Sequence, residues 1–128
     1  LLHHAILSYP EWPLWHDLSG LEQRTIDAFH HDQNLTVRIH DPDHPITQEQ
    51  RDFDIVDETY ETADCTPENR VLLTVEHPQS MRTVAWSRTF GDSRVFCLAL
   101  GHDNQAWKNP AFRDILQRGM QWSTPAHR

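Results

Sequence analysis

The pattern of apolar and polar positions along the chain predicts several short strands. Three segments alternate or are continuously apolar over the length of a strand, namely 36–40, 53–60 and 71–75. Residues 84–90 also alternate, and Gly91-Asp92 then favours a two-residue hairpin turn into 95–100. This last segment is apolar on both faces, which is typical of a central strand covered by helices on both sides.

The same pattern predicts two helices. One runs from Leu14 to Leu18 and ends at Gly20, and the other begins at Asn109-Pro110, an Asn cap followed by Pro at the first helical position. Residues 1–7 have the pattern of the end of a buried strand, whereas 21–34 are polar and irregular. Strands with interspersed helices indicate an α/β layer fold with a mixed sheet. Because two helices are too few to cover both faces, we expect 1–128 to be a single, incomplete domain.

Composition narrows the classes of function. The 128 residues carry a net charge of −8, and an acidic domain repels phosphate backbones, so we expect no nucleic-acid partner. No apolar run approaches the length of a membrane span. Two cysteines, Cys65 and Cys97, make no disulfide framework, which favours the reducing cytoplasm. Ten histidines and five tryptophans are unusually many, and the histidines direct attention to acid–base or metal chemistry.

Short motifs along almost the whole chain resemble those of ThuA-like proteins, the trehalose-utilisation family. In order, they are Leu2-His3-His4-Ala5, Trp12-Pro13, Asp43-His44-Pro45-Ile46-Thr47, Asp57-Glu58-Thr59-Tyr60, Val84-Ala85-Trp86, Arg94-Val95-Phe96, Leu100-Gly101-His102-Asp103 and Asn109-Pro110-Ala111-Phe112-Arg113. The resemblance implies a flavodoxin-like, class I glutamine-amidotransferase-like sandwich and a role in bacterial carbohydrate metabolism. It also implies strand–helix units before the first motif that this chain lacks. Two loops depart from the family pattern, because Gly20-Leu21 and Gln48-Glu49-Gln50 stand where the family has further glycines.

Candidate catalytic residues lie where strands are expected to end, because open α/β sheets bind ligands at the carboxyl ends of their strands. His3 and His4 end the first predicted strand, and His102 follows Gly101 directly after 95–100. A carboxylate of the pair Asp57-Glu58, with Glu58 as the named candidate, could fix the tautomer of a histidine, act as a general base or complete a metal site. The competing interpretations are packed or solvated histidines, a turn residue at His102 and an acidic strand edge that faces solvent.

A divalent metal, zinc or manganese, is a further expectation. Imidazole and carboxylate are suitable ligands, and His30-His31-Asp32 with the more distant His44 offers both. The chain has no His-Glu-x-x-His motif, and adjacent histidines seldom ligate one ion together. We name His31 and His102 as the candidate ligands.

Substrate contacts are predicted at Trp86, Asp103 and Trp12, because aromatic rings stack on sugar faces, although core packing is the competing interpretation for Trp86. Neither cysteine lies on a strand-to-helix elbow, so amidotransferase chemistry is not expected.

The sequence therefore predicts His/carboxylate acid–base or metal-assisted chemistry on a sugar derivative of the trehalose or keto-sugar kind. The predicted partner is a small-molecule carbohydrate. Two alternatives remain open. The chain could be a non-catalytic module that binds a sugar or a partner, or a fragment completed by an N-terminal segment or by a second copy in a homo-oligomer.

Overall fold

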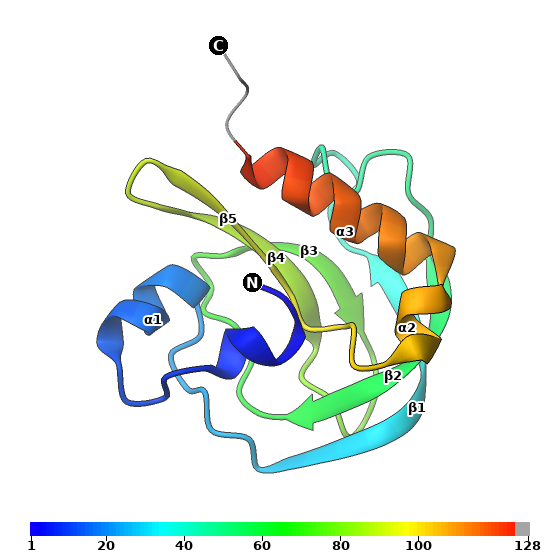
Figure 1. Cartoon of the computed structure of the whole chain (residues 1–128), viewed down its shortest axis with the longest axis horizontal. Coiled ribbons are helices and arrows are strands. Elements are labelled where there is room, and N and C mark those ends of the chain that lie inside the picture. Colours follow the sequence, from blue (N-terminus) through cyan, green and yellow to red (C-terminus); the bar gives the residue numbers. More distant parts are fainter. Residues whose placement is uncertain (125–128) are drawn as a thin grey trace.

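The computed structural model describes residues 1–124 and is a mixed α/β fold around a curled, five-stranded antiparallel sheet (Figure 1). The strand order is β2-β1-β3-β4-β5. The strands are β1 (Ala28–Ile39), β2 (Phe53–Glu61), β3 (Arg70–Val75), β4 (Thr83–Phe90) and β5 (Ser93–Leu98). The helices are the 3₁₀ helix η1 (His3–Leu7) and the α-helices α1 (Pro13–Ser19), α2 (Asn104–Lys108) and α3 (Pro110–Ser123). Within residues 1–124, no helix is both long and apolar enough to span a bilayer.

The two predicted helices and the hairpin are confirmed, and local signals explain each. Pro13 begins α1, and Gly20 ends it in the left-handed conformation at φ 75°. The Asn109 side chain accepts hydrogen bonds from the first turn of α3. Phe90 pairs with Ser93 across the two-residue turn between β4 and β5. Helix α2 was not predicted, because five residues are too few for a periodic pattern.

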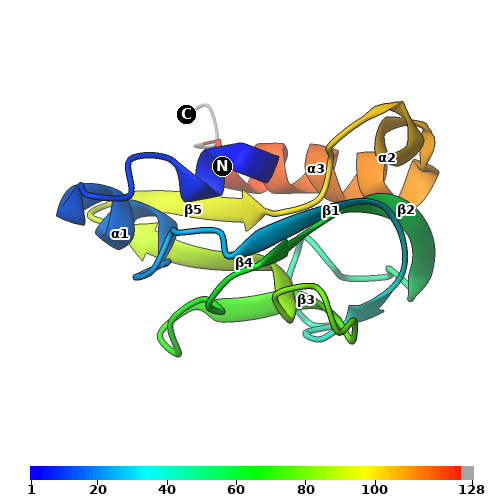
Figure 2. The ribbon, with the colours of Figure 1, turned by 90° about the horizontal axis from the view of Figure 1, so that it is seen from below.

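Strand β5 is apolar on both faces because both faces are covered. On one face Phe96 packs so closely against α3 that a Cβ at Gly119 would stand 2.1 Å from its ring. On the other, the neighbouring Trp86 of β4 is buried and donates its indole N–H to the Ser19 carbonyl at the end of α1. Seen from below, η1, α2 and α3 form the upper layer, and β3 lies lowest (Figure 2). Strand β5 is nevertheless last in the strand order, so its apolar faces do not mark a central position.

Two segments differ from their predictions. Residues 1–7 do not form a strand, because His3 takes a φ of 49° and turns the chain into η1. Only Leu2 forms a bridge, parallel to Leu98. Residues 28–34 are not irregular but belong to β1, because pairing with β2 outweighs their polarity.

The ladders between the named strands are all antiparallel, whereas a mixed sheet was expected. The Leu2–Leu98 bridge is the one parallel pairing among residues 1–124. Consecutive strands from β3 to β5 join through turns too short for the crossover that a parallel pair needs.

Candidate functional site

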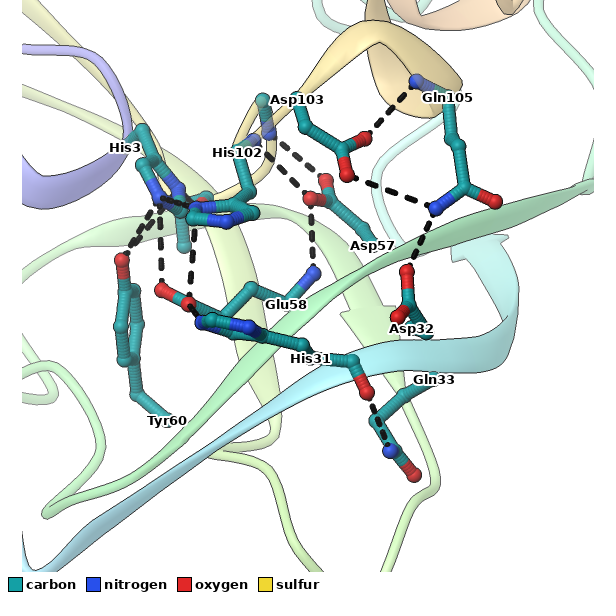
Figure 3. A network of polar contacts seen from close by, with 12 residues as sticks. His3, His31, Asp32, Gln33, Asp57, Glu58, Tyr60, His102, Asp103 and Gln105 are labelled. Carbon is teal, nitrogen blue, oxygen red and sulfur yellow. Dashed lines mark hydrogen bonds and ion pairs between the residues drawn. The ribbon is translucent and has the colours of Figure 1, made fainter.

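Three histidines from separate parts of the fold converge on the carboxylate of Glu58 in β2 (Figure 3). His31 of β1 places Nε2 2.6 Å from Glu58 Oε2. His102, in the loop before α2, places Nδ1 3.5 Å from the same oxygen, and Nε2 of His3 in η1 lies 3.6 Å from Oε1. The Glu58 side chain is only 5% exposed, whereas His31 is 54% exposed. A buried carboxyl group is therefore surrounded by imidazoles, of which His31 is the most exposed.

A bulge in β1 places His31 beside Glu58. The register of β1 against β2 shifts between His30 and Gln33, so His31 and Asp32 together lie opposite Glu58. Asp32 takes the left-handed conformation at φ 56°, which Asp tolerates better than most residues. The extra residue bends the strand locally, and this re-aims side chains at such positions.

Asp57 fixes the loop that carries His102. Its carboxylate is buried and accepts three backbone N–H groups, from Gly101 at 2.7 Å, His102 at 3.0 Å and Glu58 at 2.8 Å. Gly101 has a φ of 115°, and a Cβ there would stand 3.0 Å from Phe112 Cζ, so this position requires glycine. Asp57 thereby joins the end of β5 to the strand that bears Glu58.

Hydrogen bonds assign the tautomer of His3. Its Nδ1 lies 2.8 Å from the Ala99 carbonyl, which can only accept, so Nδ1 carries a proton, and in the neutral imidazole Nε2 then offers a lone pair. The hydroxyl of Tyr60 lies 2.8 Å from that Nε2 and can donate to it. Burial, followed by hydrogen bonding and repulsion from Glu58, raises the pKa of Tyr60, which keeps the phenol protonated. His3 is thus oriented as an acceptor, a base or a metal ligand.

Some of the distances between candidate ligand atoms are close to those of a divalent metal site. His102 Nδ1 lies 3.3 Å from His3 Nε2, and because the latter is an acceptor, either a proton or a cation is needed between the two nitrogens. A tetrahedral site with bonds of 2.0–2.1 Å has ligand atoms about 3.3–3.4 Å apart. The separations of 3.3, 3.5 and 3.6 Å are close to this value, although the last two end on different oxygens of Glu58. The 2.6 Å between His31 Nε2 and Glu58 Oε2 is instead the length of a hydrogen bond. Two groups, His31–Glu58–His102 and His3–His4–Glu58, have ligand atoms within 4.8 Å of one another.

A cavity of about 630 Å³ lies between β1, β2 and α2 and is lined by residues near the cluster in sequence, not by the cluster residues themselves. Asp54 and Val56 line it, and they share a face of β2 with Glu58 because side chains alternate along a strand. Gln105 lines it too and donates to Asp32 Oδ1 at 2.6 Å, next to His31 (Figure 3). The rest of the lining is mainly polar and comprises Asn34, Leu35, Thr36, Ile55, Lys108 and Asn109.

Most of the predicted catalytic and metal-binding residues lie together. His3, Glu58, His102 and His31 form the cluster, and the exposed His4 ring lies 5.7 Å from that of Tyr60. Two other histidines weighed as metal ligands lie elsewhere. His30 pairs with Glu61 at 2.7 Å, and His44 is buried against Ser87 and Trp122.

The predicted substrate residues are dispersed. Trp86 is completely buried, so its ring packs in the core and presents no face to a sugar. Asp103 caps α2 by accepting from Gln105 N, and this hydrogen bond lowers the pKa of its carboxyl. Trp12 lies exposed at the start of α1.

From the sequence, Asp57 is considered only together with Glu58, and neither Asp57 nor Tyr60 is named as a site residue. The signal for Tyr60 was present, because it lies two residues after Glu58 and shares its strand face. Asp57 had no comparable signal, because its partners are backbone groups 44 and 45 residues away.

Neither thiol is activated for nucleophilic chemistry. Burial raises the pKa of Cys97 to about 12 and that of Cys65 to about 11. A thiolate nucleophile needs a lowered pKa instead.

Comparison with known proteins identifies a family and several similar solved structures, two of which are described here. The profile of the ThuA family, described as trehalose utilisation, matches residues 1–123. A ThuA-like protein from Parabacteroides merdae superposes with a TM-score of 0.76 at 19% identity, over 95% of this chain and 58% of that one. A cytoplasmic protein from Salmonella typhimurium superposes with a TM-score of 0.67 at 12% identity, over 98% of this chain and 53% of that one. The chain thus spans little more than half of either structure. No curated protein matched the sequence.

Proposed function

Because this chain belongs to the ThuA family, which implies a family-level role in trehalose utilisation, we propose that it binds a divalent metal at Glu58 and assists chemistry on a sugar derivative. The observation that carries the proposal is the convergence of three imidazoles on one buried carboxylate. A lone buried carboxylate is costly, and a shared cation compensates that cost. The ligand set of nitrogen and oxygen atoms suits zinc or manganese.

The surroundings of the cluster support metal binding. A ligating histidine generally donates its second ring N–H to a carbonyl or a carboxylate, which fixes its orientation. His3 has such an arrangement, with Nδ1 on the Ala99 carbonyl and Nε2 turned to the cluster. The Asp57 carboxylate holds the backbone of His102 in the same way that an outer ligand shell does.

The cavity between β1, β2 and α2 supports a sugar as the ligand. A cavity of about 630 Å³ is in the usual range for small-molecule sites. Its amide, hydroxyl, carboxylate and ammonium groups match the hydroxyls of a carbohydrate. A metal bound beside it would polarise a carbonyl or hydroxyl oxygen, and an imidazole that does not hold the metal would transfer protons.

Metal-free acid–base chemistry is the second candidate, and the hydrogen bond from Tyr60 to His3 Nε2 favours it. In that case His3 and His102 would exchange protons with the ligand, and Glu58 would orient them. The flavodoxin-like or amidotransferase-like architecture of the whole protein, its cytoplasmic location and completion of its sheet by a further segment or copy also remain proposals.

Metal analysis of the purified protein tests the first candidate. We expect stoichiometric zinc or manganese in the wild type, lost in Glu58→Gln and in His31→Ala. His30→Ala is the matched control, because His30 lies on the same strand but pairs with Glu61. A wild-type protein that retains no metal and shows no heat on titration with zinc or manganese would refute metal binding. Equal loss in His30→Ala and His31→Ala would show that the histidines bind adventitiously.

A further inference from the structure

Three aromatic side chains form an exposed cluster at the start of α1. These are Tyr9, Trp12 and Trp15, which we call the aromatic platform. Tyr9 is 59% exposed and Trp12 46% exposed. The Tyr9 ring meets those of Trp12 and Trp15 edge-on, with centroids 5.5 and 5.1 Å away, and the two indoles are tilted by only 19°. Large exposed rings of this kind commonly mark a binding surface.

A buried arginine holds the platform in place. Arg24 is 5% exposed and donates only to backbone carbonyls, those of Ser8, Tyr9, Pro10, Trp12 and Leu21. Four of these five carbonyls belong to residues 8–12, the segment that leads into α1. Tyr9 itself takes a φ of 51°, a conformation that needs support from its surroundings. The rings are therefore preorganised, which reduces the entropy lost when a ligand binds.

The platform is physically joined to the candidate site. The Trp15 indole N–H donates to the Ala5 carbonyl at 3.2 Å, and Ala5 directly follows His4 in η1. In Figure 1, η1 lies between α1 and the segment that leads to α2. One short helix thus carries His3 on the cluster side and contacts the platform on the other.

We propose that the aromatic platform binds a pyranose ring of a carbohydrate. The choice of ligand rests on the family-level role in trehalose utilisation and on the proposed sugar ligand, but not on the metal. A pyranose has an apolar C–H face that packs on an aromatic ring, and hydroxyls at its edge. The rim of the platform supplies a partner for such hydroxyls, because the exposed Glu11 directly precedes Trp12. Preorganised rings with a polar rim suit a small rigid sugar.

Trehalose titration in the presence of EDTA tests this proposal separately from metal binding. Calorimetry and indole fluorescence would follow trehalose binding, and glucose serves as a second probe. We expect Trp12→Ala to weaken trehalose binding roughly tenfold, because stacking of one ring contributes about 1.5 kcal/mol. Trp12→Phe should recover most of the affinity. Leu14→Ala is the matched control, because Leu14 is an exposed apolar residue of the same helix without a ring.

A second variant tests whether Arg24 holds the aromatic platform in place. Arg24→Lys keeps the charge but cannot span five carbonyls, so trehalose affinity should fall while circular dichroism stays unchanged. If Arg24→Lys does not fold, Trp12→Ala and Trp12→Phe still decide the proposal. Absence of trehalose and glucose binding in the wild type overturns it. It is also overturned if Trp12→Ala and Leu14→Ala both convert a dimer to a monomer without changing sugar affinity, because the surface then binds a second copy.

Discussion

Asp57→Asn perturbs the loop that carries His102 while preserving side-chain shape. Oδ1 of Asp57 accepts from the backbone of Glu58 and His102, and Oδ2 accepts from Gly101. An asparagine keeps one acceptor oxygen, and its amide NH₂ then faces a backbone N–H that has lost its partner. Hydrogen bonds to a charged group contribute about 1.5–3 kcal/mol each, and an unsatisfied buried donor costs about 1–3 kcal/mol. We expect a loss of roughly 2–4 kcal/mol in the free energy of unfolding.

Urea unfolding followed by circular dichroism measures this loss, and the midpoint should fall without a change in slope. Asp54→Asn is the matched control, because Asp54 lies on the same strand but bonds Thr36 at an exposed position. Its effect should stay within about 0.5 kcal/mol. Metal affinity should also fall about 10- to 100-fold in Asp57→Asn, as for other residues that support a ligand. If Asp57→Asn were no more destabilising than Asp54→Asn, the carboxylate would not be what holds the loop.

Three further changes test the packing and the charge state of the fold. Gly101→Ala should lower the free energy of unfolding by about 2 kcal/mol in a urea titration, because φ is 115° at this position and Phe112 leaves no room for a Cβ. An unchanged urea midpoint would contradict this. Gly119→Ala should cost about 1–3 kcal/mol in the same assay despite better helix propensity, since its Cβ would overlap the Phe96 ring; stabilisation would show that the helix can shift. Burial lowers the pKa of His44 below 6.5, so the unfolded chain binds this proton more readily. The stability that neutral His44 contributes is fully present above pH 6.5 and is lost as the pH falls through the lower pKa of the folded state. Urea midpoints measured on both sides of pH 6.5 should therefore depend less on pH in His44→Gln than in the wild type.

Local signals predicted those parts of the fold that local chemistry decides. Gly20, Gly91-Asp92 and Asn109-Pro110 mark element boundaries by backbone conformation and capping, and all three are confirmed. The strand content of 28–34 could not be predicted in this way, because it depends on pairing with β2 about thirty residues later. The helical turn at His3 likewise depends on contacts with Ala99.

In the candidate site, too, some positions follow from local sequence and others depend on distant contacts. Alternation along β2 suffices to place Glu58 and Tyr60 on one face. The cluster also requires a contact between Tyr60 and His3, which are 57 positions apart, and one between His3 and His102, which are 99 positions apart. No local pattern encodes such contacts. From the sequence, His31 and not His30 is named as a candidate ligand, and in the structure His31 lies against Glu58 whereas His30 pairs with Glu61.

The β1 bulge determines which side chain of β1 lies against Glu58. If β1 continued the register of its later residues without the extra position, Asp32 would stand directly opposite Glu58, since Gln33 pairs with Asp57. Two carboxylates would then face each other across the ladder, a repulsive arrangement. The inserted position instead sends Asp32 towards Gln105 and leaves an imidazole against Glu58. The one extra residue of the bulge thereby replaces repulsion between two carboxylates with a contact between an imidazole and a carboxylate.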